Sequence, residues 1–289
     1  MTPDILCIGS VLWDVIGRTP SHMAVGNDVP GRIVRIPGGV ALNIAMTLRQ
    51  FGLHPALLSA VGRDEAGEEL VARCEAKGLL CEHLYRSEDL PTDVYMAIEG
   101  ANGLVAAIAD AHSLEEAGDR ILRPLSGALS GWDGPIALDG NLTETLLHEV
   151  ATSDLFVSAD LRIAPASPGK AARLAPFLSG RGTLYVNLEE AGLITRTRPA
   201  TATKGAEILL ERGAVRVLVT NGAADAADGT AAGIVRAQPP SVMVTRVTGA
   251  GDTFMAAHIA AETRGAGRED ALVRALDAAA LYVSGETPS

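Results

Sequence analysis

The residues best suited to chemistry in this sequence surround a short glycine turn, Thr248-Gly249-Ala250-Gly251, which precedes Asp252 and a helix-forming stretch. Glycines allow a sharp turn that directs several backbone N–H groups towards one point, and a helix N-terminus adds positive potential there. Such a turn can hold a transferring phosphoryl group while Asp252 accepts a proton from a hydroxyl. The alternative is structural, with Asp252 serving only as a helix cap.

A second segment, Gly38-Gly39, lies before a predicted helix that contains Asn43. A glycine pair lets a ligand approach the backbone closely, and the Asn43 amide offers a donor and an acceptor to hydroxyl groups. An ordinary loop with an asparagine near a helix start would look the same. The fingerprints GxGxxG and GxxxxGK[ST] are absent from the sequence, which weakens the case for a dinucleotide site or a P-loop.

The elements that must position these residues alternate between strand and helix. Short apolar runs predict buried parallel strands at 5–9, 56–61, 135–138, 155–159, 183–186 and 215–220. Helical periodicity falls between them, at 43–51 and 66–77 for example, and residues 252–261 form a further helix. The pattern predicts a doubly wound, mostly parallel α/β sheet flanked by helices, with ligands at the carboxyl ends of the strands.

Other segments depart from this rhythm. Residues 242–247 are predicted to form a strand before the glycine turn, and residues 223–232 a flexible loop. About 11–36 and 90–110 alternate polar and apolar residues, which predicts either a small β-sheet lid or edge hairpins. We expect one domain over residues 1–289, with this lid inserted in it.

Composition excludes several classes of protein. The 289 residues carry 24 Lys and Arg against 35 Asp and Glu, a net charge of −11, so neither nucleic acid nor an anionic membrane is the expected partner. Three cysteines without a CxxC pair predict no disulfide framework, and the histidines show no metal-ligand spacing. With no signal peptide or long apolar run, we expect a cytoplasmic protein.

Taken together, the motifs resemble the ribokinase (PfkB-type) family of sugar and nucleoside kinases along the whole chain. The matching segments, in family order, are Gly9-Ser10 with Asp14, Gly38-Gly39 with Asn43, Ser59–Asp64 with Gly67, Asn187–Glu190 and Val247–Asp252.

This resemblance implies a two-part site. The hydroxyls of the acceptor would be held by Asp14, Gly38, Gly39 and Asn43. ATP would be bound by Asn187, Glu190, Thr220, Gly222, Thr248 and Asp277, with Mg²⁺ held through water by Glu190. Gly249, Ala250 and Gly251 would form the anion hole beside the base Asp252.

Within the family, the segments Thr92–Asp110 and Ala137–Asn141 resemble those of pseudouridine kinases. The resemblance implies that Asn141, Thr92 and Tyr95 lie near the acceptor, and that pseudouridine and ATP give pseudouridine 5′-phosphate and ADP. Ribose, another nucleoside or a hexose derivative remain alternative acceptors. A ligand sensor without catalytic activity on the same fold is the alternative of a different class.

Three further expectations come from the resemblance. Many members bind a monovalent cation through an aspartate where this chain has Arg246, so the cation site is expected to be lost or rebuilt. Lys170 resembles a lysine near the phosphates. Members often pair through the lid, so a homodimer is an expectation too.

Overall fold

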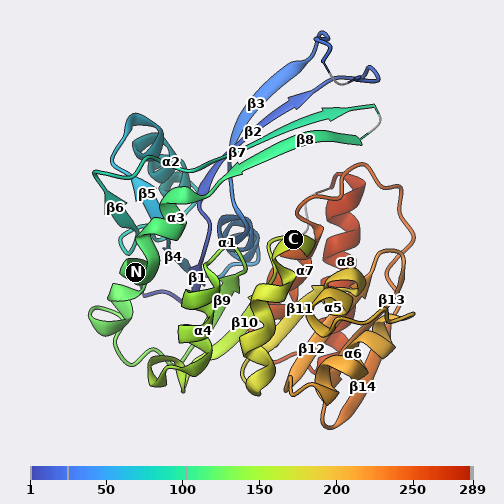
Figure 1. The fold of residues 1–289 in the computed structure, drawn as a ribbon. Coiled ribbons are helices and arrows are strands. Elements are labelled where there is room, and N and C mark those ends of the chain that lie inside the picture. The colour runs from blue at the N-terminus through green and yellow to red at the C-terminus, as the bar shows by residue number, and fades with distance from the viewer. Residues whose placement is uncertain (1, 25, 102, 287–289) are drawn as a thin grey trace.

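The computed structural model describes residues 2–24, 26–101 and 103–286, which form one large sheet and a smaller one (Figure 1). The large sheet has the order β14-β13-β12-β11-β10-β9-β1-β4. Its parallel strands are β1 (Ile5–Ile8), β4 (Pro55–Leu58), β9 (Pro135–Asp139), β10 (Asp160–Ala164), β11 (Thr183–Asn187) and β12 (Arg216–Asn221). The antiparallel strands β13 (Ala224–Thr230) and β14 (Gly233–Ala237) complete one edge. The predicted α/β class is confirmed.

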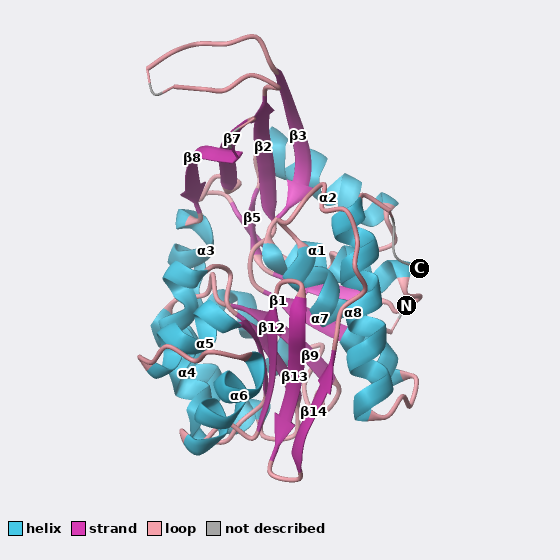
Figure 2. Cartoon of the chain, turned by 90° about the vertical axis from the view of Figure 1, so that its right-hand side faces the viewer, coloured by secondary structure: helices cyan, strands magenta, loops and turns pink. Residues whose placement is uncertain are grey.

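Helices cover both faces of this sheet (Figure 2). One core lies between the sheet and the helices α1 (Val40–Gln50), α2 (Glu65–Ala76), α7 (Ala250–Thr263) and α8 (Arg268–Ser284). The other lies under α3 (His112–Ala117), η1 (Gly118–Ser126), α4 (Glu144–Thr152), η2 (Asp154–Phe156), η3 (Pro168–Ser179), α5 (Leu188–Thr195) and α6 (Ala202–Glu211). In β1, alternate residues enter opposite cores, which explains its unbroken apolar run. In the described part of the chain, none of the helices has the length and apolarity needed to span a membrane.

The smaller sheet, which we call the lid, projects from the body (Figure 1). It consists of β2 (Leu12–Arg18), β3 (Arg32–Gly38), β7 (Val94–Gly100) and β8 (Gly103–Asp110), in the order β3-β2-β7-β8. A separate pair, β5 (Ala60–Gly62) and β6 (Tyr85–Ser87), lies near its base. The buried Trp13 joins lid to body, because its Nε1 donates to Ala66 O of α2 at 2.8 Å. The structure thus supports the lid over separate edge hairpins.

Three predicted elements were wrong. The strand expected at 155–159 is β10 at Asp160–Ala164, where the buried Arg162 interrupts the apolar pattern and is neutralised by Asp160 and Glu262. Residues 242–247 form no strand, and Val247 is 70% exposed. The expected loop at 223–232 contains β13, where small residues are required because α6 packs closely; a Cβ at Gly229 would lie 3.1 Å from Leu210.

Candidate active site

The carboxyl ends of the parallel strands bring together residues that lie far apart in the sequence. Strand β1 leads to Ser10, β9 ends at Asp139 and is followed by Asn141, and β11 and β12 place Asn187 beside Thr220 in register. Ligands of doubly wound sheets bind at this edge, where the loops diverge. The acceptor and nucleotide residues expected from the sequence therefore meet along one side of the sheet.

Asp139 organises the part of this edge where the sequence predicts the acceptor. Its buried carboxylate accepts hydrogen bonds from Ser10 N at 2.7 Å, Ser10 Oγ at 2.8 Å and Ala41 N at 3.0 Å, and from Asn141 N at 2.6 Å. A Cβ at Gly9 would lie 2.4 Å from the same carboxyl group, so only glycine fits there. The sequence motif contained Asp139 but we assigned it no role; its position directly after an apolar strand was the available signal.

The glycine pair brings Asp14 against the start of α1. A Cβ at Gly38 would lie 2.1 Å from Asp14 Oδ2, and Gly39 has a φ of 98°, which favours glycine. Burial raises the pKa of Asp14 to about 6. On the same helix, Asn43 Nδ2 donates to Asp252 Oδ2 at 3.0 Å. The expected acceptor residues and the expected base are therefore parts of one site.

Asp252 lies in the first turn of α7, where burial and neighbouring carboxylates raise its pKa. Burial raises its pKa to about 7, and the neighbouring carboxylates of Asp139, Asp14 and Glu190 act in the same direction, while the hydrogen bond from Asn43 opposes them. The reference pKa of an aspartate by itself predicts that Asp252 is fully ionised at neutral pH. The structure corrects this, because a pKa near 7 leaves a large protonated fraction at that pH.

The glycine turn leaves backbone donors available at the start of α7. Gly249 is the N-cap residue with a φ of 90°, and within the described chain no side chain caps this helix. Ala250 N donates to Val247 O at 3.1 Å, whereas a Cβ at Gly251 would meet no heavy atom within 4 Å. Because first-turn N–H groups have no acceptor within the helix, those of Gly251 and Asp252 are suited to an anion.

Asn187 and Glu190 form a capping box at the start of α5. Asn187 N donates to Glu190 Oε2 at 2.8 Å, and Glu190 N donates to Asn187 Oδ1 at 2.9 Å. Burial raises the pKa of Glu190 to about 7. Oε1 of Glu190 and Nδ2 of Asn187 take no part in this box, so both residues can also face a ligand.

This arrangement fits Mg²⁺ bound mainly by phosphates and water. Across residues 2–24, 26–101 and 103–286, no group of three or more His, Cys, Asp or Glu side chains could hold a metal by itself. Mg²⁺ commonly binds one or two carboxylates together with substrate phosphates and water. Glu190 would supply such a carboxylate, and the excess negative charge around Asp252 would favour a cation.

Other predicted site residues have different surroundings. The Thr92 hydroxyl donates to Asp64, the N-cap residue of α2, at 2.5 Å, so it holds the start of β7 against the body. Gly222 lies in the β12–β13 turn with a φ of 57° and open space at its Cβ position. Asp277 is exposed on α8. Lys170 Nζ donates to Asn141 Oδ1 at 2.5 Å, which places a cation at the acceptor edge.

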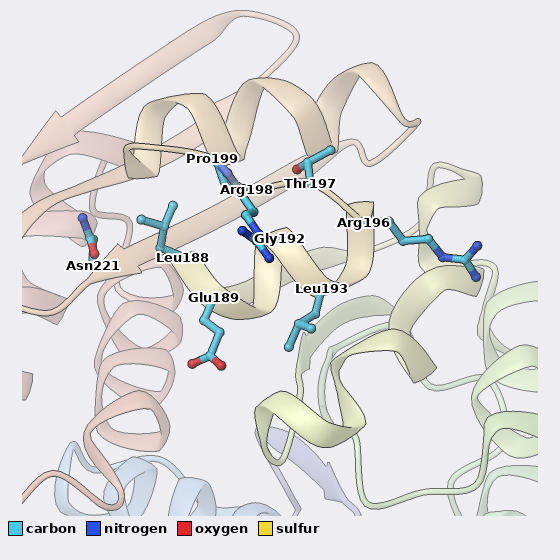
Figure 3. A pocket seen from close by; sticks show the side chains of 9 residues that line it. All are labelled: Leu188, Glu189, Gly192, Leu193, Arg196, Thr197, Arg198, Pro199 and Asn221. Carbon is cyan, nitrogen blue, oxygen red and sulfur yellow. The ribbon is translucent and has the colours of Figure 1, made fainter.

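A pocket of about 710 Å³ lies beside the residues expected to bind the nucleotide (Figure 3). Asp252 does not line it. It is lined by Leu188, Glu189, Gly192, Leu193, Arg196, Thr197, Arg198, Pro199 and Asn221. Leu188 and Asn221 directly follow Asn187 and Thr220, so this hollow adjoins the side of the site where the sequence predicts the nucleotide.

A carboxylate at a helix N-terminus, beside residues suited to hydroxyls and Mg²⁺, is the arrangement expected of a phosphotransferase, and the fold that carries it is a ribokinase-like α/β fold. The model of the pfkB carbohydrate kinase family matches residues 2–288. The chain therefore belongs to this family, whose members phosphorylate hydroxyl groups of sugars or nucleosides.

Individual relatives agree with this assignment. The chain is 27% identical to the pseudouridine kinase of Escherichia coli over 270 residues, covering 87% of this chain and 81% of the relative. It is also 27% identical to the ribokinase of Mus musculus over 268 residues, covering 88% and 80%. The Arabidopsis thaliana ribokinase solved with ribose and ATP superposes with a TM-score of 0.80 at 20% identity, over 98% of this chain and 93% of that one.

Proposed function

We propose that this protein transfers the γ-phosphoryl group of ATP to the 5′-hydroxyl of a nucleoside, pseudouridine being the favoured acceptor. The observation that carries the proposal is the hydrogen bond between Asn43 and Asp252, which joins the acceptor side to the proton acceptor. Similarity to a pseudouridine kinase over most of the chain supports the choice of acceptor.

Asp252 is the general base of this reaction. Its carboxylate accepts the proton as the acceptor oxygen forms a bond to the γ-phosphorus, and the bond from that phosphorus to the bridging oxygen of ADP breaks. Asn43 orients the carboxylate through its amide. A pKa of about 7 suits this role, because a base works best when its pKa lies near the working pH.

Charge on the transferring group is stabilised from two sides. The N–H groups of Gly251 and Asp252 approach it from the N-terminus of α7. Lys170 approaches from the other side, where its Nζ donates to Asn141 just after β9. Burial and the nearby Arg173 lower the pKa of Lys170. Mg²⁺, held through water by Glu190, would supply further neutralisation of the phosphate oxygens.

The lid face above the site favours a nucleoside over a free sugar. Asp14 pairs with Ile36 on one side and Tyr95 on the other, and Tyr95 pairs with Ala109. Residues directly opposite in neighbouring strands share a face, so Ile36 and Tyr95 flank Asp14, and Ala109 lies on the far side of Tyr95. An aromatic ring among apolar side chains suits a planar base, whereas Asp14 suits the hydroxyls of ribose.

The direct test measures ADP formation with pseudouridine, uridine, adenosine, ribose and fructose, each with MgATP. We expect the highest kcat/KM with pseudouridine. Tyr95→Ala is expected to lower kcat/KM for the nucleoside by about tenfold, the scale of one base-stacking contact, and for ribose by less than threefold. Tyr95→Phe is the matched control that keeps the ring.

Each other outcome has a defined meaning. Highest kcat/KM with ribose would replace the nucleoside proposal by a ribokinase activity, which similarity to the mouse enzyme supports as the second candidate. Binding of a nucleoside without ADP formation would instead indicate a ligand sensor.

We also propose that two copies pair through the lid. Ile33, Met96 and Ile108 are 78%, 47% and 70% exposed, and the strand register places them on the face opposite to Asp14. Apolar side chains gathered on one exposed face are typical of an interface. Light scattering is expected to give the mass of a dimer, and Ile108→Glu that of a monomer.

A further inference from the structure

The segment that leads into the glycine turn has little support of its own. Residues 238–247 lack helix or strand, and Met243 and Val247 are 81% and 70% exposed. Phosphoryl transfer depends mainly on positioning and charge stabilisation, so the turn needs a fixed conformation when ligands bind. Some other element must therefore hold it.

The last turn of α8 provides that support through its carbonyl groups. Arg246 Nε donates to Tyr282 O at 2.7 Å, and Arg246 Nη2 donates to Glu286 O at 3.2 Å. Thr245 N also donates to Val283 O, at 2.8 Å. The final carbonyl groups of a helix lack partners within the helix and carry partial negative charge, so a guanidinium is a favourable partner there.

The same arginine fixes a tyrosine that contacts the turn directly. The Arg246 guanidinium carbon lies 3.7 Å from the centroid of the Tyr282 ring, a cation–π contact. Tyr282 Oη donates to Thr248 O at 2.9 Å. A Cβ at Gly249 would lie 2.5 Å from Tyr282 Oη, so the phenol packs against the N-cap of α7.

Holding the Thr248 carbonyl determines the orientation of the next peptide group. In a planar trans peptide the C=O and the following N–H point in opposite directions. When Tyr282 holds the Thr248 carbonyl, the N–H of Gly249 must point away from the phenol, and the entry into α7 is fixed with it. A phenol is protonated at neutral pH and can donate, and burial raises the pKa of Tyr282 further.

We propose that Arg246 and Tyr282 are positioning residues that hold the glycine turn in the conformation required for phosphoryl transfer. Neither residue needs to touch a substrate. Arg246 orients the Tyr282 ring and binds it to the end of α8, and Tyr282 passes this constraint to the Thr248 carbonyl. The inference rests on the kinase activity proposed above and adds a determinant of its rate.

Two substitutions test the Arg246–Tyr282 pair, one by removing a single hydroxyl and the other by removing the whole guanidinium group. Tyr282→Phe removes only the hydroxyl, and the loss of one hydrogen bond is expected to lower kcat by about threefold to tenfold. Arg246→Gln removes the cation and its donors and is expected to lower kcat by at least about tenfold. In both variants KM for ATP and for the acceptor should change by less than twofold. Arg246→Lys should recover part of the loss, because it keeps the charge but not the planar fork.

A second arginine–tyrosine pair provides the matched control. Arg120 Nη1 donates to Tyr85 Oη at 3.2 Å, and its guanidinium carbon lies 5.2 Å from the Tyr85 ring centroid. Tyr85→Phe removes an equivalent hydroxyl elsewhere in the fold and is expected to leave kcat within twofold of the wild type.

Hydrogen–deuterium exchange gives a readout that needs no substrate. Tyr282→Phe is expected to accelerate exchange in peptides that cover residues 248–253, and Tyr85→Phe is not. The proposal is overturned if Tyr282→Phe keeps kcat within twofold and leaves this exchange unchanged, or if the loss lies in KM alone. Should Arg246→Gln fail to fold, Tyr282→Phe decides. A wild-type protein that forms no ADP would refute the proposed function, while the exchange result would still report on the pair.

Discussion

Replacing Asp252 by asparagine should remove activity and stabilise the protein. The substitution keeps the size of the side chain and an acceptor oxygen for Asn43, but it removes the group that takes the proton. General base catalysis contributes about 10²- to 10⁴-fold, so kcat should fall at least about 100-fold while the binding of ATP and acceptor stays within a few-fold.

The gain in stability follows from the raised pKa of Asp252. The carboxyl group binds its proton more tightly in the folded state, with a pKa of about 7, than in the unfolded state, with 3.8. The stabilisation from this proton is complete below pH 3.8 and is lost as the pH rises to about 7. One pKa unit corresponds to about 1.4 kcal/mol, so the loss has an upper limit of about 4 kcal/mol.

Asparagine carries no charge and avoids this loss. Because Asp252 retains some exposure to water, the gain in the free energy of unfolding should stay below this limit, and we expect Asp252→Asn to be about 1–2 kcal/mol more stable than the wild type at pH 8. At pH 5 less than half of this stability has been lost, so the stability advantage of Asp252→Asn over the wild type should be correspondingly smaller. Thermal or urea unfolding without ligands, at pH 5 and pH 8, measures both values.

Asp133→Asn is the matched control, since Asp133 is an exposed carboxylate outside the site, and it should leave turnover and stability at wild-type values. The reasoning would be refuted by an Asp252→Asn variant that is no more stable than the wild type at pH 8. Turnover above one tenth of the wild-type value would remove Asp252 as the base.

Three other measurements probe the same site. In the wild type, kcat/KM should fall as the pH is lowered through about 7, because Asp252 must be ionised to accept the proton. In Asn43→Ala the midpoint of this pH profile should move to higher pH, since a hydrogen bond that lowers the pKa of Asp252 is lost. Asp139→Asn should destabilise the fold by about 2 kcal/mol in urea unfolding, because an NH₂ group would face backbone donors such as Ser10 N, and an unchanged midpoint would contradict this. Because Arg246 stands where an aspartate is expected in a cation-binding member, exchanging potassium for tetramethylammonium should change turnover less than twofold. A many-fold rise with potassium would show that a cation site exists.

Much of the fold could be predicted from the sequence because its signals are local. Apolar runs and glycine boundaries located most parallel strands, and alternation located the lid. The failures have specific causes. Strand β10 was missed because the charged Arg162 interrupts its apolar pattern. The charge is tolerated there because Asp160 and Glu262 neutralise it, and Glu262 lies on α7, far away in the sequence. The valines at 242–247 resemble a strand, but no neighbouring strand pairs with them in the described structure.

For the site, the sequence alone predicted the kinase class and the order of the motifs along the chain. A glycine turn followed by Asp252 specifies a helix start with available amides, since backbone conformation depends on adjacent residues. The tertiary structure decided how these parts work. The pKa of Asp252, the hydrogen bonds of Asp139 and the contact of Tyr282 with the glycine turn depend on burial and on neighbours tens to hundreds of residues away. Such distances in space are set by packing, so no local pattern could have predicted them.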